Sequence, residues 1–164
     1  MHREGHLGAA LLAYTPLGAA ALAVGQVIPA ALGAVVTVAL ASVPDYDHRI
    51  PGISHRGITH TVWFAAAVAA LVGGLAAAFV GLESPDARLA GGFGALVGAV
   101  AVLSHVAADA ITPMGVTPFV PLSDRHYTLD LVRADNTVAN YLLLTAGVAA
   151  AAVAFLVTSR VAAG

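Results

Sequence analysis

The sequence predicts an all-α protein, a multi-pass transmembrane bundle of about five helices that pack through small residues. Of its 164 residues, 59% are hydrophobic and 10% are charged, and the mean hydropathy is +0.88. Soluble domains are about half apolar and about a quarter charged, so this composition indicates that lipid surrounds most of the chain. Five stretches approach the ~20 apolar residues that cross a bilayer. We expect a single integral-membrane domain, residues 1–164, with polar loops at 44–61 and 104–136.

The five expected helices follow one another along the chain with short breaks. They cover residues 7–24, 27–43, 62–82, 89–108 and 137–157. Proline can kink a helix, and Pro16 lies inside the first stretch. The first two stretches are therefore either two short helices joined near Gly25 and Gln26 or one long broken element. Glycine and alanine recur in all five, which favours close helix–helix contact in lipid.

Polar residues and prolines mark several helix ends. Ser54 and Thr59 are candidate caps for a helix that begins near His60, since serine and threonine are favoured at that position. Asp135 or Asn136 is the expected cap of the last helix. The pair Thr112-Pro113 ends the fourth helix, because the residue before proline disfavours the α conformation.

The number of crossings decides which polar segments share a side of the membrane. Five crossings place the N-terminus and the loops 44–61 and 113–136 on one side, and the loop 83–88 and the C-terminus on the other. The first side carries Arg3, Arg49, Arg56, Arg125 and Arg133, and the second carries Arg88 and Arg160. Because arginine excess marks the cytoplasmic side, we expect a multi-pass protein of the cell membrane with its polar loops in the cytoplasm. The first residues lack the features of a cleaved signal peptide, so we expect them in the mature protein.

Several classes of function find no support in the composition. The net charge of −2 gives no electrostatic attraction to nucleic acid, so no nucleic-acid partner is expected. The chain contains no cysteine, which excludes disulfides and thiolate metal sites. It also lacks a glycine-rich phosphate loop. The membrane lipid is the expected partner, and the sequence leaves the oligomeric state open.

His105 and Asp109 are the clearest candidate ligands for a metal. Their spacing of four residues places both side chains on one face of a helix. Imidazole and carboxylate groups both bind zinc, manganese, iron and nickel. The same spacing also fits a simple histidine–aspartate pair at a helix end, so the pair by itself is a weak signal.

A second polar stretch lies between the second and third expected helices. Asp45 and Asp47 follow an apolar stretch, and His55 and His60 precede the next one. Two nearby carboxylates repel each other unless a cation or a proton offsets their charge. With His6 and the His105–Asp109 pair on the same side of the membrane, these groups can converge on one or two cations. We interpret His48 and Arg49 as solvated loop residues.

The order and spacing of these residues extend over most of the chain. The elements are His6-Leu7-Gly8, Pro44-Asp45-Tyr46-Asp47-His48, His55-Arg56-Gly57-Ile58-Thr59-His60-Thr61, His105-Val-Ala-Ala-Asp109-Ala-Ile-Thr112-Pro113-Met-Gly115 and Pro118-Phe119-Val120-Pro121. Together they resemble the YdjM-like inner-membrane family, described as metal-dependent hydrolases and as LexA-binding proteins. The resemblance implies a multi-pass helical membrane protein with metal-dependent hydrolase activity. It also implies a polar site made of His6, Asp45, Asp47, His55, His60, His105 and Asp109.

The leading hypothesis is an integral-membrane hydrolase that acts on a lipid or a lipid-linked phosphate or ester. Its divalent ion would be zinc, ahead of manganese, iron or nickel. Asp47 is the candidate general base. Arg56 is either a clamp for an anionic group or an anchor at the cytoplasmic surface.

Two other classes of function remain. One is a non-catalytic membrane scaffold or regulator with a structural metal. The other is a metal or proton transporter, whose polar residues should line a path through the bilayer. The stretches 62–82 and 137–157 contain no aspartate, glutamate, arginine or histidine, so the transporter is ranked last.

Overall fold

The computed structural model describes residues 1–163, and it describes side chains up to residue 160. It confirms the all-α bundle. The helices are α1 (Arg3–Ala23), α2 (Val27–Leu40), α3 (Val62–Val80), α4 (Ala87–Ala110) and α5 (Thr137–Ala163), with short 3₁₀ helices η1 (Pro44–Arg49) and η2 (Ile58–His60). The described residues form no strand, and one isolated bridge joins Val116 to Tyr127.

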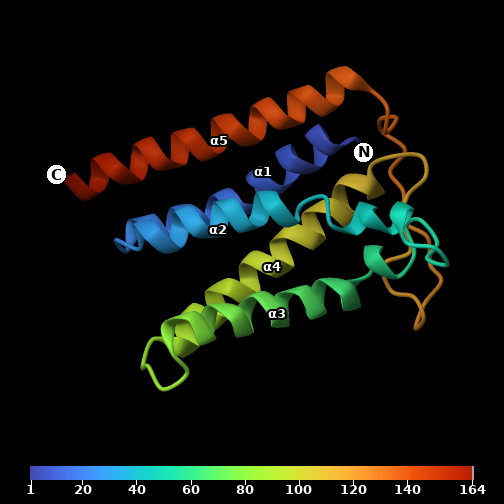
Figure 1. The fold of residues 1–164 in the computed structure, drawn as a ribbon. Helices are drawn as coiled ribbons and strands as arrows, with labels where there is room; N and C mark the ends of the chain where they lie inside the picture. Colours follow the sequence, from blue (N-terminus) through green and yellow to red (C-terminus); the bar gives the residue numbers. More distant parts are fainter. Residues whose placement is uncertain (164) are drawn as a thin grey trace.

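The five long helices run alternately up and down, so the ends predicted to share a side do meet (Figure 1). Helices α1 and α4 lie at the centre. Helix α1 packs on α2, α4 and α5, and α4 packs on α1, α2 and α3. The start of α1, the end of α2, the start of α3 and the end of α4 therefore surround one small volume. The 3₁₀ helices and the loop after α4 cover it.

The chain reverses direction once before residue 27, so the first alternative is correct: α1 and α2 are two separate helices. Gly25 makes the turn with φ +77°, a conformation that glycine adopts without steric cost. Helix α1 continues through Pro16 without a break. The hydroxyl of Tyr14 donates to the carbonyl of Ala30 at 2.6 Å, and its ring lies over Gly33, where a methyl group would collide with it. This contact holds the two helices together.

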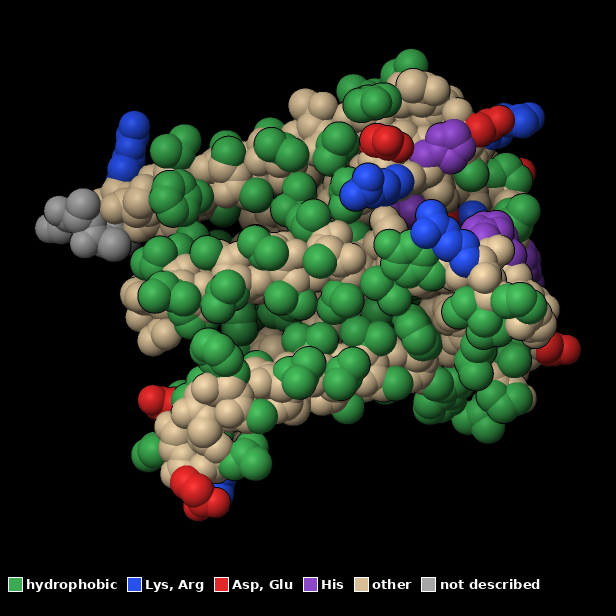
Figure 2. All heavy atoms as spheres, viewed as in Figure 1, with side chains coloured by type: hydrophobic (Ala, Val, Ile, Leu, Met, Phe, Trp, Pro, Cys, Tyr) green, Lys and Arg blue, Asp and Glu red, His purple; other side chains and the backbone are tan. Residues whose placement is uncertain are grey.

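Five helical stretches are long and apolar enough to cross a membrane: α1, α3, α4, α5, and α2 together with the turn and η1 that follow it, residues Val27–Arg49. Only 6% of the apolar window of α5 and 11% of that of α3 is buried inside the protein, compared with 44% for α4. Helices that are apolar on every side, with most of that surface outside the protein, are typical of membrane spans. In Figure 2 hydrophobic side chains cover the sides of the bundle, while the histidines gather at the end where α1 begins.

Close contact between α3 and α4 depends on glycine. A Cβ atom on Gly98 would lie 2.9 Å from the carbonyl oxygen of Val68 and 3.0 Å from Cα of Ala69. Gly73, on the other helix, faces the carbonyl oxygen of Gly91 in the same way. Lipid supplies little hydrophobic driving force between helices, so such backbone approach is what holds them together.

We expect Gly98→Val to weaken this contact and to lower the free energy of unfolding by ~1–3 kcal/mol, the usual effect of overpacking. Gly92→Val is the matched control on the same helix, because a Cβ there meets nothing within 4 Å. The measurement is thermal unfolding of both purified variants in detergent. Equal unfolding temperatures would show that the α3–α4 contact does not depend on Gly98.

Candidate metal centre

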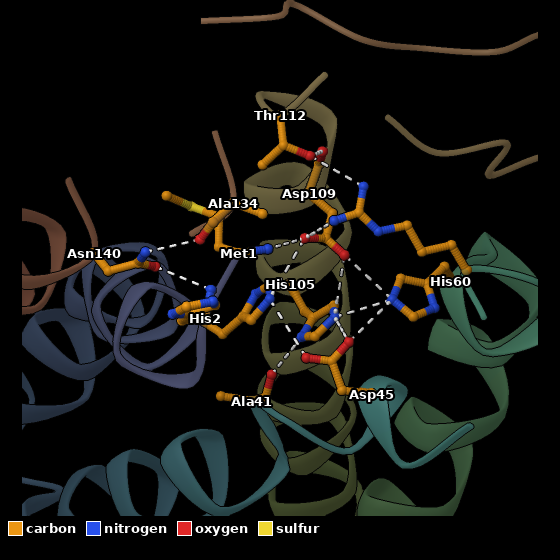
Figure 3. Close-up of polar contacts among 12 residues, drawn as sticks. Met1, His2, Ala41, Asp45, His60, His105, Asp109, Thr112, Ala134 and Asn140 are labelled. Atoms are coloured by element: carbon orange, nitrogen blue, oxygen red, sulfur yellow. Dashed lines mark hydrogen bonds and ion pairs between the residues drawn. The ribbon is translucent and has the colours of Figure 1, made fainter. Parts of the chain in front are cut away.

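Five polar side chains from four segments meet at the end of the bundle where α1 begins. Helix α1 contributes His6, η1 contributes Asp45, η2 contributes His60, and α4 contributes His105 and Asp109. Figure 3 shows the labelled members of this group pointing toward one another. The three histidines and Asp109 are fully buried, whereas the side chain of Asp45 is 29% exposed. We call these five residues the central cluster.

Each imidazole of the central cluster lies near both carboxylates. His6 Nε2 is 3.6 Å from Asp45 and 3.5 Å from Asp109. His60 Nε2 is 3.7 Å from Asp45 and 3.3 Å from Asp109. His105 Nε2 is 3.4 Å from Asp45 and 3.6 Å from Asp109. Nitrogen and oxygen donors therefore surround one point. One donor atom from each of His6, Asp45, His105 and Asp109 fits within 4.8 Å of the others, close enough for a shared ion.

Hydrogen bonds behind the rings orient two of the histidines. His105 Nδ1 donates to the carbonyl oxygen of Ala41 at 2.7 Å, so the other nitrogen of the neutral ring carries the lone pair. His60 Nδ1 lies 3.0 Å from the hydroxyl of Thr59. The two Nε2 atoms then face each other at 3.1 Å. Metal-binding histidines are typically held in this way through the nitrogen that does not bind the ion.

Three buried polar atoms of the central cluster have no hydrogen-bond partner: Nδ1 and Nε2 of His6, and Oδ2 of Asp109. The ring of His6 is stacked on that of His105, with centroids 3.6 Å apart. Buried polar atoms almost always have a partner, and a bound ion is one of the recognised explanations for an exception. A divalent cation would bind to Nε2 of His6 and to Oδ2 of Asp109. The residues present therefore fit a metal ion.

The carboxylates of the central cluster also favour positive charge at His60. Burial lowers the pKa of His60, but the carboxylates of Asp109 and Asp45 outweigh burial and raise this pKa above its ordinary value. The same two carboxylates would stabilise a metal cation among the three rings.

Asp47 lies behind the cluster and hydrogen-bonds with its neighbours. One oxygen accepts from His55 Nδ1 at 3.0 Å, and the other accepts from the backbone N–H of Arg56 and from the hydroxyl of Thr59, both at 3.0 Å. Among the described residues, Asp47 belongs to no group of side chains whose donor atoms lie close enough together to share an ion. Its expected roles as a metal ligand and as general base remain predictions. Its contacts show that it orients His55 and Thr59.

Arg56 ties the loop after η1 to the end of α4. Its guanidinium donates to Asp109 at 2.7 Å, to the Thr112 hydroxyl at 3.0 Å and to the Gly115 carbonyl at 2.9 Å. The amino group of Met1 also contacts Asp109. Arg56 has φ +57°, an uncommon conformation for a residue with a side chain, so the loop is held in an unusual shape here. Its expected role as an anion clamp remains a prediction, because these donors already bind within the protein.

The local capping differs from expectation at α3 and agrees with it at α5. Ser54 and Thr59 do not cap α3, which begins at Val62. Its cap is Thr61, whose hydroxyl accepts from the backbone N–H of Phe64. Thr59 is instead bound to Asp47, and this contact supports His60. Asn136 caps α5 by accepting from the N–H of Ala139 at 2.9 Å.

His55 and His48 lie next to the central cluster, on its exposed side. The structure places donor atoms of Asp45, His48 and His55 within 4.8 Å of one another. The expectation from the sequence for His48 is a solvated loop residue. It is exposed, but it also belongs to this group, which the sequence reasoning missed.

An open cavity of about 740 Å³ borders both groups. Its walls include Asp45, His48, His55 and Arg56, together with residues from the loop after α4, among them Met114 and Arg133. Asp45 is the one member of the central cluster on this wall. A molecule from water can therefore approach the cluster at Asp45.

No curated protein and no solved structure matches this chain. One family model does match, over residues 1–163, and it is described as the YdjM inner membrane protein. The match covers all five helices and every residue of the central cluster. The chain therefore belongs to the YdjM inner membrane protein family.

Proposed function

We propose that the protein is an integral-membrane, metal-dependent hydrolase whose ion is held by the central cluster. One observation carries this proposal. Donor atoms of His6, Asp45, His105 and Asp109 lie within 4.8 Å of one another, and buried donor atoms on His6 and Asp109 lack any hydrogen-bond partner. Burying ionisable groups in a membrane protein costs free energy, so such groups are typically found where they serve a function. The cluster therefore indicates a functional site.

Zinc is the proposed ion. Imidazole nitrogen and carboxylate oxygen are good zinc ligands, and the absence of cysteine leaves only these donor types. Manganese, iron and nickel accept similar donors, so they are the alternatives to test. A bound divalent cation would supply Lewis-acid polarisation of the scissile group and would acidify a water molecule.

The residues of the chain divide the remaining tasks by position. Asp45 is half-buried and borders the cavity, so it is the carboxylate that an entering water molecule or substrate meets first. Asp47 is fully buried behind His55 and accepts three hydrogen bonds. Asp45 is therefore placed to hold an ion where water or substrate enters, and Asp47 is placed to keep His55 oriented.

The cavity suggests the substrate class. It lies at the end of the bundle, and its wall combines the charged side chain of Arg133 with the apolar side chain of Met114. We propose a lipid or lipid-linked phosphate or ester, whose polar part would enter from the membrane surface. Arg133 is exposed and forms an ion pair with Asp135, so it can exchange this partner for an anionic group.

Metal content provides the direct test of the central cluster. We expect the purified wild-type protein, stripped and then reloaded with zinc, to keep at least one equivalent, and the His105→Ala, Asp109→Ala double variant to lose it. His126→Ala is the control, because His126 is exposed and belongs to neither group of donor atoms. Equal metal content in the wild type and the double variant would refute the assignment.

We also propose that the central cluster faces the cytoplasm, as the arginine distribution predicts. The chain has no cysteine, so single cysteines can be labelled without background. Glu83→Cys and Asp124→Cys place exposed thiols at opposite ends of the bundle. We expect an impermeant maleimide to label Glu83→Cys in intact cells and Asp124→Cys only after permeabilisation. The reverse pattern would place the cluster outside.

A structural metal in a non-catalytic scaffold is the second candidate function, and the number of protein donors favours it. Structural zinc sites have four protein ligands, whereas catalytic sites keep a position open. Cobalt(II) substitution separates the two functions. A change in the visible spectrum when inorganic phosphate is added indicates an open position and supports the hydrolase, and an unchanged spectrum supports the scaffold.

A further inference from the structure

We propose that the protein has a second divalent-cation site, formed by Asp45, His48 and His55 and adjacent to the central cluster. Both sites would use the carboxylate of Asp45. The second site depends on the proposed function only through this shared ligand. Three observations support it: the period of η1, the orientation of His55 and the exposure of all three ligands.

The geometry of η1 brings Asp45 and His48 together. This element is a 3₁₀ helix that spans Pro44–Arg49. A 3₁₀ helix has three residues per turn, so side chains three apart lie above one another. Asp45 and His48 therefore share one side of η1. Asp47 belongs to a different side, where it is fully buried.

The buried carboxylate of Asp47 orients the third ligand. It accepts a hydrogen bond from His55 Nδ1 at 3.0 Å, which leaves Nε2 of His55 as the nitrogen with a free lone pair. The backbone N–H of Arg56 and the hydroxyl of Thr59 hold Asp47 in place. A carboxylate that binds the far nitrogen of a histidine is the usual second partner of a metal-binding imidazole. A histidine that only contacts water would not need a buried carboxylate to orient its ring.

The three ligands meet at the cavity wall. The rings of His48 and His55 are stacked, with centroids 3.6 Å apart and planes 28° apart. One donor atom from each of Asp45, His48 and His55 lies within 4.8 Å of the others. All three residues line the 740 Å³ cavity. The side chains of Asp45 and His55 are 29% and 28% exposed, so water or a ligand can reach an ion held there.

The two sites would differ in character. The central cluster is almost closed, because four of its five side chains are fully buried. The second site has three protein ligands and an open side, the arrangement typical of a catalytic ion. Two cations close together favour a phosphate ester among the proposed substrates, since such a pair can hold the attacking and leaving oxygens of a phosphate.

Metal stoichiometry tests this proposal on the full-length protein in detergent. The protein is stripped with a chelator, dialysed against zinc and analysed by mass spectrometry of the metal. We expect about two equivalents in the wild type and about one in His48→Ala, as for a paired-metal site that loses one ion. His126→Ala is the matched control and should keep the wild-type value. His48 is exposed, so its replacement should leave the fold intact, and size-exclusion chromatography checks this.

Manganese provides a second readout that is independent of activity. Two manganese ions that share a carboxylate are magnetically coupled, so we expect a coupled electron paramagnetic resonance signal in the wild type and an uncoupled one in His48→Ala. Inorganic phosphate should bind to the metal-loaded His48→Ala protein at least tenfold more weakly than to the metal-loaded wild type. Equal phosphate affinity in the two proteins would show that the two ions do not bind phosphate together.

The outcomes distinguish this proposal from the proposed function. One equivalent in the wild type and one in His48→Ala would overturn the second site and leave the central cluster standing. Two equivalents in both proteins would also overturn it, because His48 would then not be a ligand. No bound metal in the wild type would overturn both proposals.

Discussion

Asp109→Ala is expected to abolish metal binding at the central cluster and to destabilise the protein even without metal. Asp109 contacts all three imidazoles of the cluster and accepts a hydrogen bond from Arg56 at 2.7 Å. The Arg56 side chain is only 8% exposed, so the variant leaves a buried charge without its carboxylate. Removing one partner of a buried ion pair costs about 3–5 kcal/mol. The measurement is unfolding in detergent in the presence of a chelator.

Two further variants separate the ion pair from a general effect of the substitution. Arg56→Met combined with Asp109→Ala should recover part of the lost stability, because it removes the unpaired charge. Asp135→Ala should change stability little, because Asp135 and Arg133 form an exposed pair at the surface. A metal-free Asp109→Ala protein as stable as the metal-free wild type would show that Arg56 does not depend on Asp109.

Removal of the divalent cation is expected to lower the unfolding temperature of the wild-type protein substantially. A ligand that binds only the folded state stabilises it, by about 2.7 kcal/mol when its concentration is 100 times the dissociation constant. The ligands come from segments before α2, between α2 and α3, and at the end of α4, so the ion would join parts far apart in the sequence. The measurement is a thermal scan with zinc and with excess chelator.

The His105→Ala, Asp109→Ala variant is the control for this effect. It lacks two ligands of the central cluster but keeps Asp45, His48 and His55, so zinc should raise its unfolding temperature by less than it raises that of the wild type. A wild-type protein that is equally stable with zinc and with chelator would mean that no ion is bound at the cluster under those conditions.

The helical part of the fold could be predicted from the sequence because lipid constrains it strongly. A span needs a long apolar stretch, and each of the five expected stretches overlaps one helix. The same reasoning brought His6 to the cluster, since the four crossings between the N-terminus and the end of α4 put both on one side. The fixed period of the α-helix brought His105 and Asp109 together.

The site was harder to predict where the chain is not α-helical. Residues 44–49 read as a loop, and six residues are too few to show the period of three that η1 follows. That period decides that Asp45 and His48 share a side and that Asp47 does not. Sequence reasoning therefore grouped Asp45 with Asp47 and set His48 aside.

Contacts between residues far apart in the sequence could not be predicted either. Arg56 lies on Asp109, which is 53 residues away, and only the packing of the loop after η1 on the end of α4 decides this. Thr61, and not Thr59, caps α3, and the hydroxyl of Thr59 instead donates to Asp47. In both cases a tertiary contact determines the role of a residue whose local sequence fits several roles.

Anomalous diffraction from crystals of the zinc-loaded protein tests the central claim most directly. We predict a peak at the absorption edge of zinc within about 2.0–2.2 Å of nitrogen and oxygen atoms of the central cluster, the usual bond lengths for zinc. His6, His105 and Asp109 should be among the ligands, with Asp45 on the side of the cavity. A zinc-loaded crystal with no peak among these residues would contradict the claim.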